Sequence, residues 1–325
     1  MEAVEHYQGT ASLQQYIVKR LVQFIPVCFG VTVLVFCLLR FAPGDAAYIR
    51  LQDRGMDVSA ESLAQIRREL GLDQPLWVQY VHWIKAVLHL NLGNSVVTNE
   101  PVIAELSIHF RMTALLTLPA MALVVAIAFP LGLLSAVYQG RLWDHITRIT
   151  AIVAMSVPSF CVGLLCILLF AVYLQWLPSF GKGTPTHLVM PCLVLSIAPA
   201  AHYTRLIRTA LLEELSKEYI RAARARGVGL GNLLWSHAMR NAFIPILTAL
   251  GMNLALMLGG SAVVEKVFSW PGLGKYLIDA ILQRDYPVVQ GCVLLYAFLF
   301  GGINLATDLL CIFMDPRFRR GNYSG

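Results

Sequence analysis

The sequence predicts an all-α membrane protein, a polytopic bundle of six transmembrane helices, and three observations support this fold class. Of the 325 residues, 57% are hydrophobic and 14% are Asp, Glu, Lys or Arg, whereas a soluble domain has about 45–50% apolar and about 25% charged residues. The mean hydropathy is +0.64, which excludes a disordered chain, since such chains are poor in apolar residues. The third observation is that the apolar residues gather into six long stretches.

Each of these stretches is long enough to cross a bilayer, which takes about 20 mostly apolar residues in a helix. Only a helix or a closed barrel satisfies the backbone polar groups in lipid. Pro158, Pro191 and Pro199 interrupt the third and fourth stretches, so these helices are the least regular of the set. The predicted spans are 17–39, 113–138, 149–175, 187–206, 242–264 and 289–313.

Basic residues gather in alternate loops, and this pattern predicts the orientation. Lys and Arg lie at the start of span one, in the loops that join spans two and three and spans four and five, and after span six. The long external segment carries six more, but long loops follow the charge rule poorly. Cytoplasmic loops carry an excess of Lys and Arg, so we expect both termini to be cytoplasmic and the net charge of +6 to reflect orientation rather than nucleic-acid binding. The chain then divides into a cytoplasmic extension (1–16), a transmembrane domain (17–314) and a cytoplasmic tail (315–325). Within the domain lie an external segment (about 42–112) and a cytoplasmic loop (about 208–240).

No catalytic or metal-binding motif is visible in the sequence. The closest approach to a phosphate-binding loop is Gly274-Lys275, but Tyr276 stands where that loop needs Ser or Thr. The seven cysteines are odd in number and form no C-x-x-C pair, and the histidines show no metal-ligand spacing. We therefore expect no catalytic residue, no metal ligand and no cofactor in this chain. Any energy for its work must come from a partner.

The external segment is expected to form two amphipathic helices. Ser59 is a plausible N-cap for the first, which carries Leu63 on its apolar face. Trp77 and Tyr80 lie on one side of the second, and aromatic residues suit a membrane–water interface. The favoured interpretation for both is a packed cap over the bundle rather than a surface that contacts substrate.

The cytoplasmic loop is longer than a helix bundle needs. Leu211, Leu215, Tyr219 and Ala223 recur every four positions, which predicts one face of a helix. Gly227 and its neighbouring glycines are expected to end that helix, and a second short helix then runs into span five. Periodicity alone leaves two interpretations open: a docking element for another protein, or an amphipathic helix in the membrane interface.

The same loop carries a family resemblance. Residues 218–227 read EYIRAARARG and residues 237–245 read HAMRNAFIP, which resembles the EAA loop of ABC importer permeases, in the branch that imports dipeptides, oligopeptides and nickel. Further motifs in matching order cover nearly the whole chain: PGD at 43–45, LGLDQPL at 70–76, FSWPGLG at 268–274, RDYP at 284–287 and DPR at 315–317.

The resemblance implies a type I ABC importer permease in a bacterial inner membrane. Its partners would be a second homologous permease, two ATPase subunits that bind ATP and Mg, and an external solute-binding protein, with no role for nucleic acid. The residues that would couple to the ATPase, or anchor the helix that follows, are Glu218, Ala222, Ala223, Gly227, Arg240, Asn241 and Pro245.

On the external side, two Pro- and Gly-containing motifs are expected to face the binding protein. Pro and Gly at this density mainly define backbone shape, so a rigid scaffold is the favoured primary role, with docking built on it. The residues are Trp270, Pro271, Gly272, Gly274, Arg284, Asp285, Tyr286 and Pro287.

The cargo is expected to be nickel or a metal chelate, with a di- or oligopeptide as the alternative. Local matches to nickel-type permeases lie around Lys85–His89 and at 172–178, and Asn253 in span five is a candidate residue of the cavity. An ion-coupled secondary transporter is the rival from another class, but such proteins carry ionisable groups near the membrane centre. Asp308 is the one convincing acidic candidate within a span, since Glu265 is expected to be solvated at an external helix end.

Overall fold

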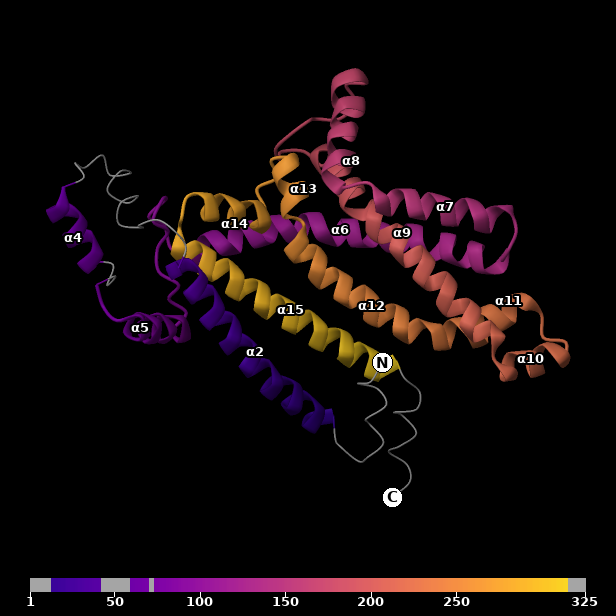
Figure 1. The fold of residues 1–325 in the computed structure, drawn as a ribbon. Helices are drawn as coiled ribbons and strands as arrows, with labels where there is room; N and C mark the ends of the chain where they lie inside the picture. The colour runs from indigo at the N-terminus through magenta and orange to yellow at the C-terminus, as the bar shows by residue number, and fades with distance from the viewer. Residues whose placement is uncertain (1–12, 42–58, 70–72, 315–325) are drawn as a thin grey trace. The chain divides into compact units, whose positions relative to one another are not determined.

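The computed structural model describes residues 13–41, 59–69 and 73–314 (Figure 1). Within these ranges every regular element is a helix, apart from one isolated bridge between Asn94 and Pro101, which confirms the all-α class. The tail at 315–325, the PGD motif at 43–45 and most of the N-terminal extension lie outside the described residues. The elements are α2 (Leu13–Phe41), α4 (Ala60–Glu69), α5 (Leu76–Leu88), α6 (Val102–Val137), α7 (Leu142–Ser156), α8 (Ser159–Cys166), the π-helix η1 (Ile167–Tyr173), α9 (Thr186–Ser216), α10 (Glu218–Ala225), α11 (Leu230–Asn232), the π-helix η2 (Leu233–Ala238), α12 (Met239–Gly260), α13 (Ala262–Val267), α14 (Leu273–Leu282) and α15 (Tyr286–Met314).

Five stretches of helix in the described residues are long and apolar enough to cross a membrane. They correspond to predicted spans one, two, four, five and six, and most of them extend beyond the predicted ends. Helix α6 begins at Val102 rather than near residue 113, and α9 continues to Ser216 rather than 206. A hydropathy pattern detects only the apolar part of a helix, whereas backbone hydrogen bonding continues into its polar ends. The five stretches are Gln15–Phe41, Val102–Val137, Thr186–Ser216, Leu233–Val267 and Tyr286–Met314.

The prediction of one helix at 149–175 is wrong. Helix α7 and the α8–η1 pair meet at a bend of 96° (Figure 1), so they make a sixth span only if this broken pair is counted as one. Val157 between them is extended (ψ 124°) and Pro158 is the N-cap residue of α8. Proline disfavours helical backbone in the residue before it and lacks an amide hydrogen, which explains the break.

Helix α7 shows a burial pattern that suits a membrane. Its buried face carries the polar residues Asp144 and Thr147 beside Ala151, while most of its exposed residues are apolar. In water this arrangement would be unfavourable, because exposed apolar area is what folding removes. A lipid environment removes that cost. The exposed apolar residues of α7 are Leu142, Trp143, Ile146, Ile149, Ile152, Val153 and Met155.

The described chain divides into two compact units. Unit 1 comprises residues up to Ile108 together with 277–305, and unit 2 comprises 109–276 with the residues from Ala306 onward. In unit 1, Phe36 of α2 contacts Tyr80 and Trp83 of α5, with ring centroids 5.4 Å and 6.1 Å apart. The predicted second amphipathic helix therefore uses its aromatic residues to pack against the first span.

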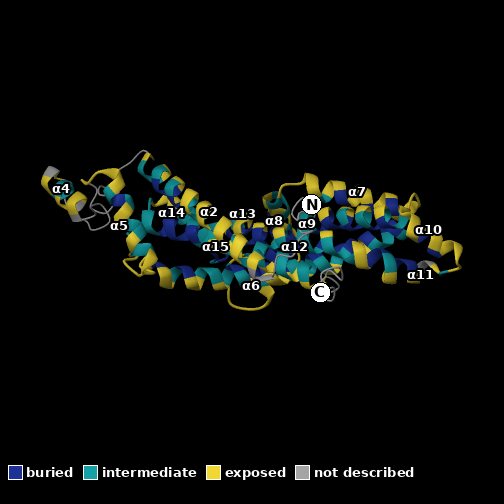
Figure 2. Ribbon diagram, turned by 90° about the horizontal axis from the view of Figure 1, so that it is seen from below, coloured by how far each residue is buried: buried dark blue, intermediate teal, exposed yellow. Residues whose placement is uncertain are grey.

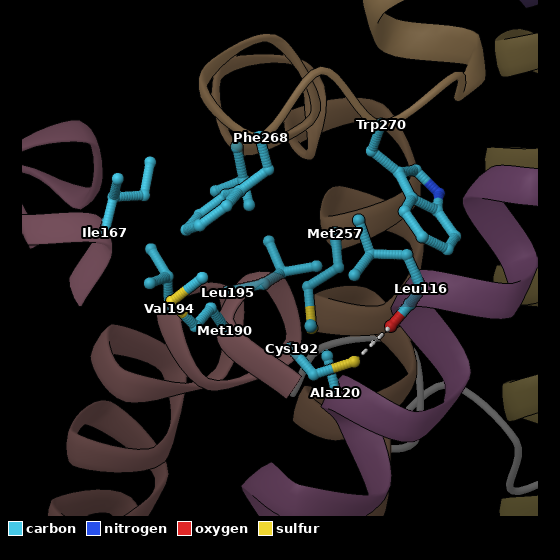
Figure 3. Close-up of a cluster of buried hydrophobic side chains, with 11 residues drawn as sticks. Leu116, Ala120, Ile167, Met190, Cys192, Val194, Leu195, Met257, Phe268 and Trp270 are labelled. Carbon is cyan, nitrogen blue, oxygen red and sulfur yellow. Dashed lines mark hydrogen bonds between the residues drawn. The ribbon is translucent and has the colours of Figure 1, made fainter. Parts of the chain in front are cut away.

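Unit 2 is built around α9, which packs against α7, α8, α10 and α12. One buried cluster joins residues of α6, η1, α9, α12 and α13 with Trp270, which follows α13 (Figure 3). A second joins α6 and α9 to η2 and α12 through Val124, Ile207, Ala238 and Ile246. Both clusters thus have α6, α9 and α12 in common.

Candidate functional site

Helix α10 presents one face to its own unit and the other to its surroundings. Ile220 and Ala223 point inward and are buried in a small cluster with Leu233. Glu218 and Ala222, one turn apart, lie on the opposite, exposed face. Figure 2 shows most of α10 as exposed. Ala223 is therefore buried on the side of α10 opposite to this face. Its direct contact with an ATPase remains a prediction.

The prediction that residues 211–223 form one helix is wrong. Lys217 has an extended backbone (φ −68°, ψ 152°) and separates α9 from α10. Leu211 lies on α9 and Ala223 on α10. The break turns α10 so that Ile220 and Ala223 can pack on Leu233, a tertiary contact that four-residue spacing does not reveal.

Gly227 ends α10, as the glycine pattern predicts. Its amide donates to the carbonyl of Arg224 (2.9 Å) and the next amide, of Val228, donates to that of Ala223 (3.3 Å), the two bonds of a Schellman motif. Gly227 has φ +85°, a left-handed conformation that other residues adopt with strain, yet a Cβ there would meet no atom within 4 Å. Glycine is thus needed for the turn, while the space around it is open.

Three polar side chains join α10 to the helices before and after it. The amide nitrogen of Asn241 donates to the Tyr219 hydroxyl (2.8 Å), and that hydroxyl donates to the carboxylate of Glu214 (2.7 Å). Glu214 lies on α9 and Asn241 on α12. Burial, and then the hydrogen bond to Glu214, raise the pKa of Tyr219. Lys217 donates to the other Glu214 oxygen, and this bond raises the lysine pKa.

The other predicted anchors lie in α12. Arg240 and Pro245 are exposed. Pro245 lies inside α12, which starts at Met239 rather than at residue 242, the predicted start of span five. Its ring can donate no hydrogen bond to the carbonyl of Asn241, so the helix lacks one backbone bond beside the residue that contacts Tyr219.

A buried ion pair that sequence reasoning missed lies where α6, α7 and α9 meet. The guanidinium of Arg208 donates to both carboxylate oxygens of Asp144 (2.7 and 2.8 Å), and Asp144 is 1% exposed. Ser135 Oγ (2.6 Å) and the amide of Gly140 (2.9 Å) also donate to this carboxylate. The sequence does show that Asp144 is an acid in a short, otherwise basic loop. Its partner Arg208 is 64 positions away, so the pair could not be predicted from the sequence.

A second buried carboxylate lies beyond the far end of α12. We expected Glu265 to be solvated, and this is wrong: it is 0% exposed. It accepts hydrogen bonds from Thr113 Oγ1 (2.7 Å), Ser261 Oγ (2.8 Å) and the amide of Lys275 (2.8 Å). Gly272 packs so closely that an added Cβ would lie 2.3 Å from the carboxylate carbon. Three donors and one closely packed glycine therefore surround this carboxylate in place of the solvent that we expected.

The FSWPGLG motif at 268–274 is a buried turn around this carboxylate. Trp270 is 2% exposed, and its indole nitrogen donates to the carbonyl of Met112 (2.9 Å). Trp270 and Phe268 approach the cluster that contains Leu116 and Met257 (Figure 3). The motif is therefore built as a rigid scaffold, the favoured interpretation above, while its contact with a binding protein remains a prediction.

In unit 1, the RDYP motif at 284–287 is also a structural cap. Asp285 is 2% exposed and accepts from the Ser95 hydroxyl (2.5 Å) and the amide of Val96 (3.0 Å). Arg284 adopts the left-handed region (φ 56°), while Tyr286 and Pro287 are half-buried. The carboxylate thus holds the segment before α6 against the start of α15.

Asn253, the candidate cavity residue, lies midway along α12 and is half-buried. Its amide nitrogen is 3.2 Å from the sulfur of Met257 and 3.6 Å from that of Met121. Within the described residues no three His, Cys, Asp or Glu side chains gather as metal ligands would. The cavity role of Asn253 remains a prediction.

Comparisons with known proteins cover almost the whole chain. The model of the "binding-protein-dependent transport system inner membrane component" family matches residues 128–320, and the model of its N-terminal part matches residues 13–117. The glutathione transport system permease proteins of Escherichia coli O6:H1 and Salmonella choleraesuis are each 40% identical over 304 residues, which is 94% of this chain and 98% of theirs. An inward-facing structure of the MetNI methionine ABC transporter aligns with a TM-score of 0.56 at 20% identity, over 66% of this chain and 97% of that one. This likeness supports the type I permease fold.

Proposed function

Because this chain belongs to the family of binding-protein-dependent transport system inner membrane components, we propose that it is the permease of an ABC importer for short peptides. Members of this family are multi-pass inner-membrane permeases that work with ATPase and substrate-binding partners. They are not catalytic, since the partner ATPase hydrolyses the ATP.

The choice of cargo rests on the similarity to glutathione permeases, which are 40% identical over 94% of this chain. It favours the peptide alternative over nickel or a metal chelate, although both cargo types occur among ABC importers of this kind. The local matches around Lys85–His89 and 172–178 are short by comparison. We therefore propose a peptide of about glutathione's size as the substrate.

The cargo is tested with the permease co-expressed with the ATPase, second permease and binding-protein genes of its own organism. Proteoliposomes that enclose ATP and Mg receive, from outside, the binding protein with tritiated glutathione, labelled Ala-Ala or ⁶³Ni. We expect ATP-dependent uptake of a peptide and no uptake of nickel. ATP-dependent uptake of nickel alone would restore the metal hypothesis, and uptake driven by a proton gradient without ATP would support the secondary transporter.

We further propose that the exposed face of α10 docks on the ATPase. Glu218 and Ala222 lie on that face, and the open space at Gly227 allows another protein surface to approach the backbone. The proposal requires α10 and both termini on the cytoplasmic side, and an assembly of two permeases, two ATPase subunits with ATP and Mg, and one binding protein.

A matched pair of glycine variants tests this docking site. Gly181, in the loop before α9, resembles Gly227 in having a positive φ (+91°) and no atom within 4 Å of an added Cβ. Gly227→Asp and Gly181→Asp therefore introduce the same strain and the same charge. We expect Gly227→Asp to abolish ATP-driven uptake while insertion in the membrane persists, and Gly181→Asp to retain uptake. Normal transport and assembly with Gly227→Asp would show that the docking site is elsewhere.

A further inference from the structure

The phenol of Tyr219 bridges α10 to both of its neighbours. It donates to Glu214 on α9 (2.7 Å) and accepts from Asn241 on α12 (2.8 Å). The residues are five and 22 positions away in sequence, so the bridge closes a loop around the whole of α10, α11 and η2. We call this set of three residues the Tyr219 bridge.

The backbone alone does not make α10 move with α9. At Lys217 the chain is extended, and the amides of Ile220 and Arg221 bond to the carbonyl of Lys217 rather than to residues of α9. A continuous helical hydrogen-bond ladder resists bending, whereas at one extended residue φ and ψ can change without breaking such a ladder. Side-chain contacts therefore decide whether the two helices move together.

The connection to α12 is also weak in the backbone. Between Ala225 and Met239 the chain passes through the Gly227 turn, a three-residue helix and a π-helix. Pro245 then removes the backbone bond that the carbonyl of Asn241 would accept within α12. Asn241 thus lies in a turn of α12 that lacks one backbone hydrogen bond, and its side chain contacts Tyr219.

Lys217 orients the carboxylate of Glu214 for its contact with Tyr219. Glu214 is largely buried, and Lys217 binds its Oε1 while Tyr219 binds Oε2. With one oxygen occupied by the lysine, the carboxylate presents the other in a fixed direction. A hydrogen bond to an ionised acceptor is shorter and stronger than one between neutral groups, so the bridge is stiff at its α9 end.

We propose that Tyr219 is a positioning residue for energy coupling: its hydroxyl links α10 to α9 and α12, so that one displacement of α10 moves both membrane helices. The inference rests on the proposed docking of α10 on an ATPase, but it assigns the transmission to a residue that faces its own chain rather than the partner.

The test compares Tyr219→Phe with wild type in the assembled importer, reconstituted with its partner subunits in proteoliposomes. The readout is the amount of cargo imported per ATP hydrolysed, with tritiated glutathione, labelled Ala-Ala or ⁶³Ni as the cargo, whichever the wild type takes up. Phenylalanine keeps the ring and removes only the hydroxyl. We expect a loss of about threefold to tenfold in this ratio, the order of the net contribution of one hydrogen bond, with unchanged amounts of assembled complex.

Two controls separate positioning from a general structural defect. Ser216→Ala removes a hydroxyl that bonds the carbonyl of Glu213 beside the same helix break, and it should leave the ratio unchanged. Asn241→Ala should lower the ratio, and Tyr219→Phe combined with Asn241→Ala should lower it no further, because both variants open the same bridge.

The outcomes are distinguishable. A Tyr219→Phe importer with the wild-type ratio would overturn the bridge and leave the docking site intact. A parallel fall of uptake and ATP hydrolysis with less assembled complex would assign Tyr219 a purely structural role and would also overturn the proposal. Absence of ATP-driven uptake of all three cargoes by the wild type would overturn both this inference and the proposed function.

Discussion

At the Asn241 end of α12 the polar contacts are partly exposed, whereas beyond its Gly260 end they are sealed from solvent. Tyr219, which joins α10 to its neighbours, is 39% exposed, while Glu265 is 0% exposed and has three donors to its carboxylate. Helix α12 has 22 residues, about 33 Å at ~1.5 Å per residue, which is close to the ~30 Å of a bilayer core. The two arrangements are therefore separated by about the thickness of a bilayer core.

Gly227 and Gly272 show how the packing differs between these two regions. At Gly227 an added Cβ meets nothing within 4 Å, while at Gly272 it would lie 2.3 Å from the Glu265 carboxylate. The first glycine shapes a turn beside open space, and the second is needed because its neighbours leave no room. One end of α12 thus lies near open space, and the other is tightly packed.

The largest effect expected is the loss of the buried ion pair. Asp144→Asn leaves Arg208 without its carboxylate, and removing one member of a buried pair costs about 3–5 kcal/mol. We expect a large fall in the melting temperature of the purified importer. This pair joins α7 to α9, the helix that precedes α10. The variant therefore tests whether a rigid base, meaning α7 and α9 held together by this pair, stabilises the part of the chain next to α10.

Lys217→Gln is the matched control for that prediction. It removes the pair with Glu214, whose lysine side chain is 53% exposed, and exposed pairs contribute about 0–1 kcal/mol. Similar losses from Asp144→Asn and Lys217→Gln would contradict the assignment of a rigid base.

The next largest effect is expected from an added methyl group at Gly272. Gly272→Ala forces a Cβ into the space occupied by the Glu265 carboxylate, and overpacking of this kind costs about 1–3 kcal/mol. Gly227→Ala meets no atom, so its cost is limited to the strain of a positive φ, about 1 kcal/mol. Thermal melting of both variants measures the difference, and a greater loss at Gly227 would reverse the comparison.

A smaller effect is expected from removing the charge of Glu265. Glu265→Gln keeps the shape but turns one acceptor oxygen into a donor, which leaves a donor such as the Lys275 amide without a partner at a cost of about 1–2 kcal/mol. Glu218→Gln on the exposed face of α10 should change stability by less than about 0.5 kcal/mol. We expect it to reduce ATP-driven uptake instead. Equal stabilities of the two variants would show that the Glu265 network contributes nothing to the fold.

The smallest effect expected is an alkaline loosening of α10. The pKa of Lys217 is raised from 10.5 and that of Tyr219 from 10.0 in the folded chain. Both groups favour their protonated forms when folded, so their contribution is complete at neutral pH and is lost as pH rises above these values. We expect α10 to become more sensitive to proteolysis above about pH 10, and Tyr219→Phe to reduce this change. An unchanged alkaline sensitivity in Tyr219→Phe would show that Tyr219 is not its source.

Local patterns in the sequence predicted several of these features correctly. Ser59 caps α4 by accepting from the amide of Ser62 (3.1 Å), as its position predicts, and Gly227 ends α10. Both depend on bonds between residues a few positions apart, where spacing and backbone geometry are sufficient evidence.

The same patterns failed wherever a distant residue decided the outcome. Glu265 was expected in solvent, but Thr113, 152 positions away, accompanies it in the core. Asp285 was recognised in the RDYP motif, yet the structure joins it to Ser95, which is 190 positions away. Burial and pairing depend on which helices lie side by side, and a single sequence carries no record of that.

The sequence by itself determined the class of protein, its membrane location and the local start and end of many helices, because apolar length, loop charge and capping are properties of contiguous residues. Tertiary structure decided which carboxylates are buried, where the third predicted span breaks and how α10 is held between α9 and α12. These outcomes depend on packing and hydrogen bonding between segments far apart in the chain. The free energy of a residue's local conformational preference is small compared with the cost of burying a polar group without a hydrogen-bond partner.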